Sequence, residues 1–307
     1  MNKKQDILFY KYFQSWIYIY KKGSIRDISF NKYSSALDWL IKIVPNLKLS
    51  ELNRLKYQEI LNEYALYHER PTTMDFHHHL KACLLDAFDD GLIEKDPTRN
   101  VVVKGKHPKK KKPKYLSKFE LQLLIKQLKL KNKINYDWLI LLIAKTGLRF
   151  SEAIALTPSD FDFNKQSLSV NKTWDYKTNS GFQPTKNKSS VRKIQLDWMT
   201  TSQFAGLIKD LPDDQPIFLI KGNLFNSTIN DILQRRCKKA DIPVITVHGL
   251  RHTHASILLY AGVSIASVAR RLGHASMNTT EKVYLHIINE LENKDIDLVM
   301  RSVSSLT

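Results

Sequence analysis

Four side chains near the end of the sequence have the types and the spacing that phosphodiester chemistry needs. His248 precedes Arg251 by three residues, a Gly-His pair begins 22 residues after that arginine, and Tyr284 follows His274 by ten residues. A guanidinium group pairs with two phosphate oxygens at once and stays charged, and a histidine donates or exchanges a proton near neutral pH. A deprotonated tyrosine oxygen is a nucleophile that can form a covalent phosphoryl intermediate. The set therefore predicts a site that cuts phosphodiester bonds.

A second arginine stands after a tight turn in the run TGLRFSEAIAL. A buried helix over residues 136–145 is expected to end at the turn Thr146-Gly147, and Arg149 is expected at the start of the next helix. Glu152 follows this arginine by three residues. That spacing places the carboxylate to hold the guanidinium group by an ion pair.

Together these runs resemble the motifs of the tyrosine recombinase (phage integrase) family: T-G-L-R-x-S-E, then H-x-x-R, then G-H, then Tyr. The resemblance implies that Arg149 and Arg251 bind the scissile phosphate and that His274 donates a further hydrogen bond to it. It implies that His248 assists proton transfer at Tyr284. The tyrosine would attack phosphorus and leave a 3′-phosphotyrosine and a free 5′ hydroxyl, with no cofactor and no metal.

The resemblance also implies a lysine general acid in a β-hairpin loop. The run PTKNKSSVRKIQL is typical of a turn followed by a strand, and it places this lysine at Lys186. Lys188 is the alternative, because loop lengths vary at this point. His252 and His254 flank the H-x-x-R motif without matching its catalytic positions, so we treat them as supporting residues at most.

Local signals predict the elements that present these side chains. Gly262 fits the end of the helix that begins near the H-x-x-R motif, because glycine enters the left-handed conformation at little cost. Ser264 is a candidate cap of a short helix that Gly273 would end, which leaves the second histidine on a turn. Thr279 or Thr280 is the candidate cap of the helix that carries the tyrosine.

The composition points to a polyanionic partner. The formal net charge is +18 at 307 residues, with 43% hydrophobic residues, so a folded protein that binds nucleic acid is expected. The N-terminus has no signal-peptide pattern, and Cys83 and Cys237 are too few for a disulfide framework, which favours a cytoplasmic protein. Residues 77–79 are three consecutive histidines, which point about 100° apart on a helix and so favour ordinary helix positions over a metal site.

The first 103 residues are expected to form a bundle of short helices. Apolar residues recur at helical spacing, and the predicted helices cover residues 7–20, 33–44, 55–67 and 72–90, the last with Thr72 or Thr73 as its cap. Within the family resemblance, this bundle looks like a core-binding, SAM-like domain that clamps DNA opposite the catalytic domain.

A basic, proline-containing segment separates the two halves. Residues 101–133 contain twelve lysines and one acidic residue, and like-charge repulsion together with proline opposes compaction. We expect residues 104–114 to link the bundle to a catalytic domain over residues 115–307. The segment is interpreted as a strap along the DNA backbone, with a solvated spacer as the alternative. The candidate DNA-binding residues are Lys109, Lys110, Lys111 and Lys112.

The catalytic half is expected to be α+β. Ser117 and Glu120 predict a capping box at its first helix. DFDFNKQSLSV is typical of a hairpin, and NKTWDYK is expected to continue the same sheet. The predicted fold class is therefore mainly α with a small antiparallel β-sheet. The tail after Tyr284 is compatible with a final amphipathic helix that docks either on its own domain or on a neighbouring protomer.

The resemblance implies double-stranded DNA recombination sites as partners, a homo-tetramer on DNA, and an accessory DNA-bending or directionality factor. The chain resembles the two-domain members of the family, the type without a separate arm-binding domain. Integration or excision of a mobile element is the favoured role, and chromosome-dimer resolution is the alternative. A type IB topoisomerase or a catalytically idle DNA-binding protein is a more distant alternative.

Overall fold

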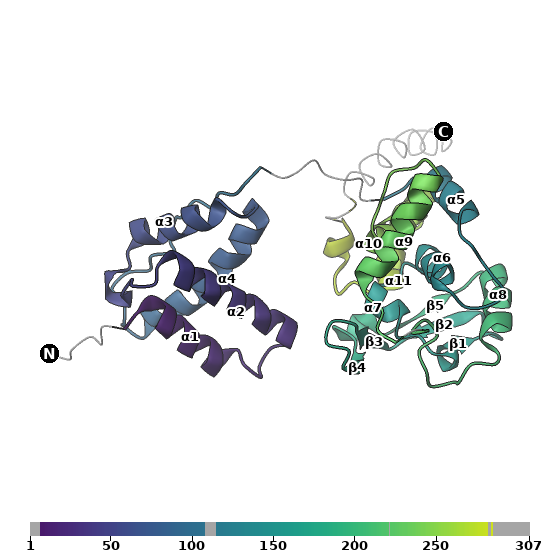
Figure 1. Ribbon diagram of the computed structural model, residues 1–307, viewed down its shortest axis with the longest axis horizontal. Helices are drawn as coiled ribbons and strands as arrows, with labels where there is room; N and C mark the ends of the chain where they lie inside the picture. The colour runs from purple at the N-terminus through teal and green to yellow at the C-terminus, as the bar shows by residue number, and fades with distance from the viewer. Residues whose placement is uncertain (1–6, 108–114, 221, 282–283, 285–307) are drawn as a thin grey trace, which may run out of the picture. The chain divides into compact units, whose positions relative to one another are not determined.

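The computed structural model describes residues 7–107, 115–220, 222–281 and 284. The chain divides into two compact units, Met1–Lys110 and Lys111–Thr307 (Figure 1). The described residues are mainly helical, and the strands of the second unit form small antiparallel sheets. The predicted fold class is confirmed.

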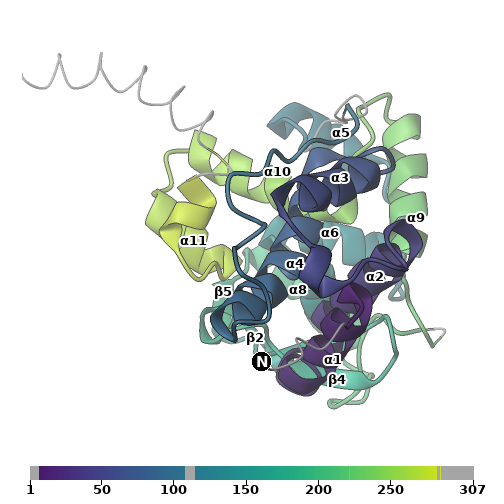
Figure 2. The same cartoon turned by 90° about the vertical axis from the view of Figure 1, so that its left-hand side faces the viewer.

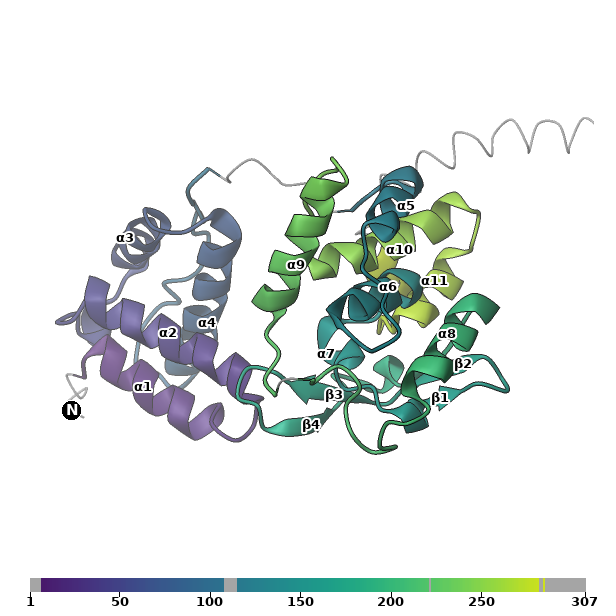
Figure 3. The same ribbon diagram turned by 45° about the vertical axis from the view of Figure 1, so that its right-hand side comes forward.

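The first unit is a helical bundle around an aromatic core. Its helices are α1 (Phe9–Tyr20), α2 (Asp27–Ile43), α3 (Arg54–Ala65) and α4 (Arg70–Asp89), with a 3-10 turn at Leu49–Glu51. Helices α1 and α2 lie side by side (Figure 3). Phe9, Phe13 and Tyr57 are completely buried between the helices. Aromatic burial on this scale is enough to hold short helices that would be marginal alone.

Helix α4 begins earlier than the sequence predicts. It starts at Arg70, and Glu69 rather than Thr72 or Thr73 precedes its first turn. Pro71 occupies that first turn, where the missing N–H group costs no intrahelical hydrogen bond. The predicted cap was wrong because proline at a helix start is itself a start signal.

The residues just before the predicted linker and its first residues are paired with the first unit. Gln58 and Val102 exchange two hydrogen bonds of 2.8 Å, and the amide of Lys106 donates to the carbonyl of His68 at 2.8 Å. Gly105 lies so close to the backbone of Arg70 that a Cβ atom would stand 2.1 Å from its nitrogen. Residues 101–106 are therefore built into the bundle. The lysines at positions 109–112 lie outside the described residues.

The three consecutive histidines occupy ordinary positions on α4. Nδ1 of His77 lies 3.0 Å from the hydroxyl of buried Tyr57, and the ring of His79 packs against Tyr33 with centroids 4.3 Å apart. Among the residues that the structure describes, no group of His, Cys, Asp and Glu side chains is arranged to hold a metal ion. No helix of that part of the chain has the length and apolar character to cross a membrane.

The second unit is built around the buried helix α6. Its helices are α5 (Lys118–Lys126), α6 (Tyr136–Thr146), α7 (Phe150–Ala153), α8 (Trp198–Ile208), α9 (Asn226–Lys239), α10 (Val247–Tyr260) and α11 (Ile265–Leu272). Every residue from 137 to 144 is buried, and α9 and α10 pack against this helix. Helices α10 and α11 lie next to each other (Figure 2). The capping box of Ser117 and Glu120 on α5 is confirmed.

The strands form two sheets rather than one. Strands β1 (Phe161–Asp162), β2 (Ser167–Val170) and β5 (Arg192–Gln195) make an antiparallel sheet, and β3 (Lys172–Asp175) pairs only with β4 (Gly181–Pro184). The prediction that NKTWDYK continues the first sheet was wrong. Val170 faces Arg192 and Lys172 faces Pro184, so Asn171 stands opposite the whole of residues 185–191. Residues 185–191 thus form a loop, called the bulge below, which contains the 3-10 turn Lys188–Ser190 and interrupts the ladder.

Local caps set the ends of the last helices. Ser264 accepts from the amide of Ser267 at the start of α11, and Gly273 ends that helix with φ of 69°, both as predicted. The following helical segment begins at Met277, ahead of the predicted caps Thr279 and Thr280. Ser276 stands before it and accepts from the amide of Asn278 at 3.2 Å. The predicted tail helix after Tyr284 lies outside the described residues.

Candidate active site

The predicted site residues of the second unit come from separate elements that converge around two guanidinium groups. Arg149 precedes α7, His248 and Arg251 lie on the first turns of α10, and His274 follows α11. Tyr284 lies on the helical segment after residue 277. Burial lowers the pKa of Arg251, His248 and His274, and the nearby charge of Arg149 lowers each of them further. These residues therefore share one electrostatic environment.

Arg251 is a buried cation held by backbone carbonyls. Its Nη1 donates to the carbonyl of Gly147 and its Nη2 to the carbonyl of Leu272, each at 2.7 Å. A guanidinium group has five N–H donors, so these bonds leave donors for a ligand. Burial, followed by the charge of Arg149, lowers the pKa of Arg251 to about 9, so the group is protonated at neutral pH. A bound anion would relieve the cost of that buried charge.

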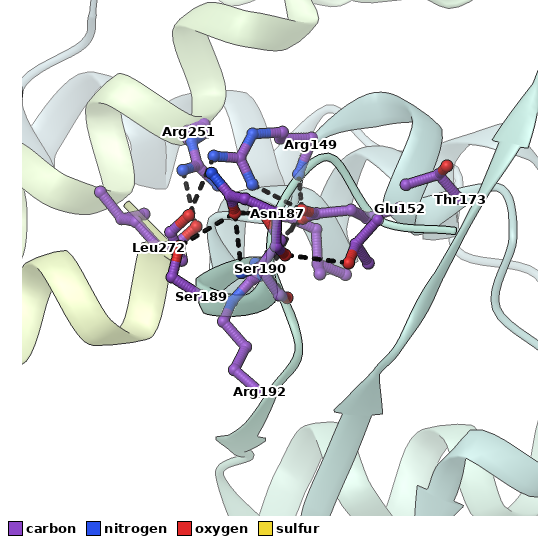
Figure 4. Close-up of polar contacts among 12 residues, drawn as sticks. Arg149, Glu152, Thr173, Asn187, Ser189, Ser190, Arg192, Arg251 and Leu272 are labelled. Atoms are coloured by element: carbon purple, nitrogen blue, oxygen red, sulfur yellow. Dashed lines mark hydrogen bonds and ion pairs between the residues drawn. The ribbon is translucent and has the colours of Figure 1, made fainter. Parts of the chain in front are cut away.

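Arg149 is fixed by the carboxylate that the sequence assigned to it. Its Nη1 donates to Oε1 of Glu152 at 2.6 Å, its amide donates to Oε2 at 2.9 Å, and its Nη2 donates to the carbonyl of Gly273 at 3.1 Å. The guanidinium group lies beside that of Arg251 at the loop of Asn187 and Ser190 (Figure 4). Two arginine forks with fixed directions can bind the two free oxygens of a phosphodiester.

Arg192 is a site residue that the sequence reasoning missed. Its Nη2 and Nη1 donate to Glu152 at 2.9 and 3.2 Å, and its Nε donates to the carbonyl of Arg271 at 2.7 Å. It also donates to the carbonyl of Ser190 at 3.0 Å, which ties the bulge to the arginine pair. The K-x-K-S-S-x-R run contains this arginine, but its partner Glu152 lies 40 residues earlier.

The two candidate lysines lie on the bulge between β4 and β5. Asn187 accepts at its Oδ1 from the amide and the hydroxyl of Ser190, at 3.1 and 2.6 Å, which shapes this loop (Figure 4). Lys186 and Lys188 precede and follow that asparagine, and both side chains are exposed. Both lysines therefore remain candidates, on a loop that Asn187 and Arg192 hold at the edge of the site.

His274 is oriented by a buried hydroxyl. Its Nδ1 lies 2.8 Å from Oγ1 of Thr280, a residue with no exposed surface. Burial, and then the charges of Arg251 and Arg149, lower the pKa of His274 to about 4. The imidazole is therefore neutral at pH 7. Donation from Thr280 to Nδ1 would leave the hydrogen on Nε2, where it can donate to a phosphate oxygen.

Tyr284 contacts His252, which the sequence reasoning treated as supporting at most. The hydroxyl of Tyr284 lies 2.9 Å from Nδ1 of His252, and the tyrosine is 2% exposed. Burial raises the pKa of this hydroxyl, and the charge of Arg251 opposes the rise. Partial burial, then the charges of Arg251 and Arg149, lower the pKa of His248, whose ring packs edge-on against His252 with centroids 4.7 Å apart.

His254, which the sequence reasoning treated as supporting at most, pairs with Arg271 beneath the turn before Arg149. Nδ1 of His254 lies 3.0 Å from the carbonyl of Ala144, so it carries the hydrogen, and its Nε2 accepts from Nε of Arg271 at 3.0 Å. The ring stands where a Cβ atom on Gly147 would fall, 2.8 Å from Cδ2. His254 therefore has a structural role beneath the site.

The charges of the site favour an anion. In the part of the chain that the structure describes, Glu152 is the one carboxylate that pairs with Arg149 and Arg192, and its charge also acts on Arg251. Preorganised donors of this kind stabilise the charge that develops on a phosphorane-like transition state. With a buried tyrosine beside them, they can support the attack of its oxygen on phosphorus.

Comparisons with known proteins agree with this chemistry. The sequence model of the phage integrase family matches residues 114–290. The integrase of Staphylococcus phage L54a is 30% identical over 172 residues, which cover 49% of this chain and 48% of that integrase. The XerC-like tyrosine recombinase of Caldanaerobacter subterraneus subsp. tengcongensis is 23% identical, and the match covers 95% of this chain and 83% of that protein.

A solved structure shares the fold over nearly the whole chain. The Tn1549 transposon integrase, in complex with transposon right end DNA, has a TM-score of 0.75 at 20% identity, covering 91% of this chain and 95% of that one. At this identity the likeness concerns the fold. The chain spans about half the length of the phage L54a integrase and most of the XerC-like protein.

Proposed function

Because the chain belongs to the phage integrase family, we propose that it is a site-specific DNA recombinase that cuts and rejoins DNA through a 3′-phosphotyrosine. The observation that carries the proposal is the convergence of Arg149 and Arg251 on the carbonyls of Gly273 and Leu272, directly before His274, in the same unit as the buried Tyr284, whose hydroxyl contacts α10. This arrangement joins a phosphate-binding group to an oxygen nucleophile.

Each residue has a chemical task in this proposal. Arg149 and Arg251 bind the non-bridging oxygens of the scissile phosphate, and His274 donates to the same group from Nε2. As negative charge grows on these oxygens in the transition state, fixed donors stabilise it without reorganisation. Tyr284 attacks phosphorus, and the 5′ oxygen leaves. Glu152 keeps the first arginine in place through its 2.6 Å ion pair.

The leaving oxygen takes a proton from a lysine of the bulge, Lys186 in the proposal and Lys188 in its alternative. The bond between phosphorus and the tyrosine oxygen conserves the energy of the cut bond. The 5′ hydroxyl of a partner strand can therefore reverse the reaction without ATP. The guanidinium groups supply the positive charge that such a transition state needs.

Double-stranded DNA is the proposed substrate. The net charge of +18 attracts a polyanion, and Lys109, Lys110, Lys111 and Lys112 are proposed contacts to its backbone. Such contacts position the protein and carry little sequence information. A homo-tetramer on two duplexes and an accessory DNA-bending or directionality factor belong to the same proposal.

Integration or excision of a mobile element is the favoured role. The similar proteins include a phage integrase and a transposon integrase, and an XerC-like recombinase supports chromosome-dimer resolution as the second role. Relaxation of a plain supercoiled plasmid without any special sequence would instead indicate a topoisomerase.

Covalent trapping tests the proposal. The full chain is incubated with nicked duplexes taken from the DNA that flanks its own gene, and denaturant-resistant complexes are detected beside a Tyr284→Phe control. The wild type is expected to form an adduct with a free 5′ hydroxyl that the variant lacks. An adduct that persists in Tyr284→Phe would show that Tyr284 is not the nucleophile. Binding without any adduct would favour a catalytically idle DNA-binding protein.

A further inference from the structure

We infer that His252 accepts the proton of the Tyr284 hydroxyl when this tyrosine attacks phosphorus, an inference that rests on the proposed function. The family resemblance gives this task to His248, and nothing in the H-x-x-R motif assigns a role to the residue after its arginine. In the structure, the nitrogen at hydrogen-bond distance from the tyrosine oxygen belongs to His252.

The contact has the geometry that proton transfer requires. Nδ1 of His252 lies 2.9 Å from the hydroxyl of Tyr284, within the range over which a general base works. The two rings are tilted by 60° with centroids 5.8 Å apart, so they meet at the polar edge and do not stack. Because Tyr284 is 2% exposed, bulk water has little access to its hydroxyl. A side-chain base is therefore needed where the proton leaves.

The helical spacing separates the tasks of the two histidines. His248 and His252 are four residues apart on α10, so their rings lie on one face of the helix and pack edge-on at 4.7 Å. His248 therefore packs against the ring of His252 and helps to position it, while His252 contacts the reacting oxygen.

The proton of Tyr284 moves to His252 while phosphorus exchanges its bond to the 5′ oxygen for a bond to the tyrosine oxygen. This transfer requires that, in the resting site, Nδ1 of His252 accepts from the Tyr284 hydroxyl while Nε2 carries the hydrogen. During attack the O–H bond of Tyr284 breaks, its proton passes to Nδ1, and the oxygen forms a bond to phosphorus. The bond from phosphorus to the 5′ oxygen breaks, and that oxygen takes a proton from the bulge lysine. Rejoining reverses each transfer, and His252 returns its proton to the tyrosine oxygen.

The surrounding charges couple this transfer to bound DNA. On α10, His248 packs against His252 and Arg251 lies one residue before it. On the turn after α11, the pKa of His274 is lowered first by burial, then by the charges of Arg251, Arg149 and Arg192, and last by His252. Arg251 stabilises the tyrosine oxygen as it becomes negative, since its charge acts to lower the pKa of Tyr284. An imidazolium at His252 is repelled by these cations. The negative phosphate offsets that repulsion, so the proton moves when the substrate is in place.

Cleavage kinetics test the inference. The wild type, His252→Ala and His248→Ala are each compared on a nicked duplex that gives the wild-type adduct, and the single-turnover rate of adduct formation is measured from pH 6 to 9. His252→Ala is expected to slow cleavage by about 10²–10⁴-fold with unchanged affinity for the duplex. Its rate should keep rising with pH, and added imidazole should restore part of it. Cleavage at the full rate in His252→Ala, or rescue by imidazole in His248→Ala alone, would overturn the inference.

A measurement without DNA separates this inference from the proposed function. In protein labelled with ¹⁵N-histidine, the His252 signals are assigned by their loss in His252→Gln, whose thermal unfolding also checks that the variant folds. Tyr284→Phe removes the hydroxyl and is expected to shift the Nδ1 signal of His252. If the wild type forms no adduct on any duplex, the recombinase proposal fails. An unchanged Nδ1 signal overturns the role of His252 whatever the DNA experiments give.

Discussion

Glu152 and Arg192 form a buried ion pair that joins helix α7 to strand β5. The two charged atoms are 2.9 Å apart, and the side chains are 1% and 6% exposed. The same carboxylate holds Arg149 at 2.6 Å. One acidic group therefore neutralises part of two cations and connects Arg149 to strand β5.

Replacing this carboxylate is expected to destabilise the second unit. Glu152→Gln removes the negative charge and leaves Arg149 and Arg192 close together without it, so the free energy of unfolding should fall by about 3–5 kcal/mol. Urea unfolding followed by tryptophan fluorescence measures the change. Lys165→Ala is the matched control, because its ion pair with Asp162 spans 3.9 Å and its side chain is 78% exposed. Lys165→Ala is expected to lose less than about 1 kcal/mol of unfolding free energy. An equally small loss in Glu152→Gln would contradict the stabilising role of this carboxylate.

The same pair predicts how stability depends on pH. Burial acts to raise the pKa of Glu152, but the hydrogen bond and charge of Arg192, with the charge of Arg149, outweigh it and hold the pKa below the ordinary value. The unfolded chain then binds the proton more readily, so the stabilisation is present above the unfolded pKa of about 4.3. It is lost as the pH falls through the lower folded pKa. Unfolding of the wild type and of Glu152→Gln between pH 6 and 3 should therefore converge at the acid end, and parallel curves would refute the prediction.

Gly147 is expected to be intolerant of a side chain for two separable reasons. Its φ of +69° is unfavourable for other residues, and a Cβ atom would lie 2.8 Å from His254 and from Leu272. Gly262→Ala is the control, since its φ is +82° with no atom within 4 Å of the added carbon. The control should lose about 1–2 kcal/mol of unfolding free energy, and Gly147→Ala more, because the ring of His254 must also move. Equal losses in the two variants would mean that the contact has no cost.

Several features set by neighbours in the sequence were predicted correctly, whereas contacts between residues far apart in the sequence were not. Ser117, Ser264 and Gly273 act on neighbours within a turn, and the structure confirms them as caps and helix ends. The pairing of Val170 with Arg192 spans the chain between two strands, so the bulge that it creates has no local signature. The same holds for the contact of His252 with Tyr284, 32 residues apart. Residue types and local spacing therefore select the candidate set, but they do not predict the long-range contacts that support it.

The contact between Thr280 and His274 predicts that the Thr280 hydroxyl contributes to the cleavage rate and not to the affinity for DNA. Thr280→Val keeps the shape of the side chain but removes the hydroxyl that lies 2.8 Å from Nδ1. The imidazole then loses the partner that fixes its tautomer, so the rate of adduct formation should fall about tenfold, which is the worth of one hydrogen bond near 1.4 kcal/mol. Single-turnover cleavage and filter binding on one duplex measure the two effects. A weaker affinity with an unchanged rate would place the hydroxyl in DNA binding.

A sulfur leaving group distinguishes Lys186 from Lys188. When the 5′ oxygen of the scissile bond is replaced by sulfur, the leaving thiolate needs no general acid, because a thiol has a pKa of about 8.5. Loss of the true acid should therefore slow cleavage of ordinary DNA by about 10²–10⁴-fold and leave cleavage of the sulfur-containing duplex close to the wild-type rate. Lys186→Ala is expected to behave in this way. Lys188→Ala, on the same exposed bulge, is the matched control and should slow both substrates by the same small factor, because only a phosphate contact is lost. The reverse pattern would assign the acid to Lys188, and equal slowing of both substrates by both variants would mean that neither lysine protonates the leaving oxygen.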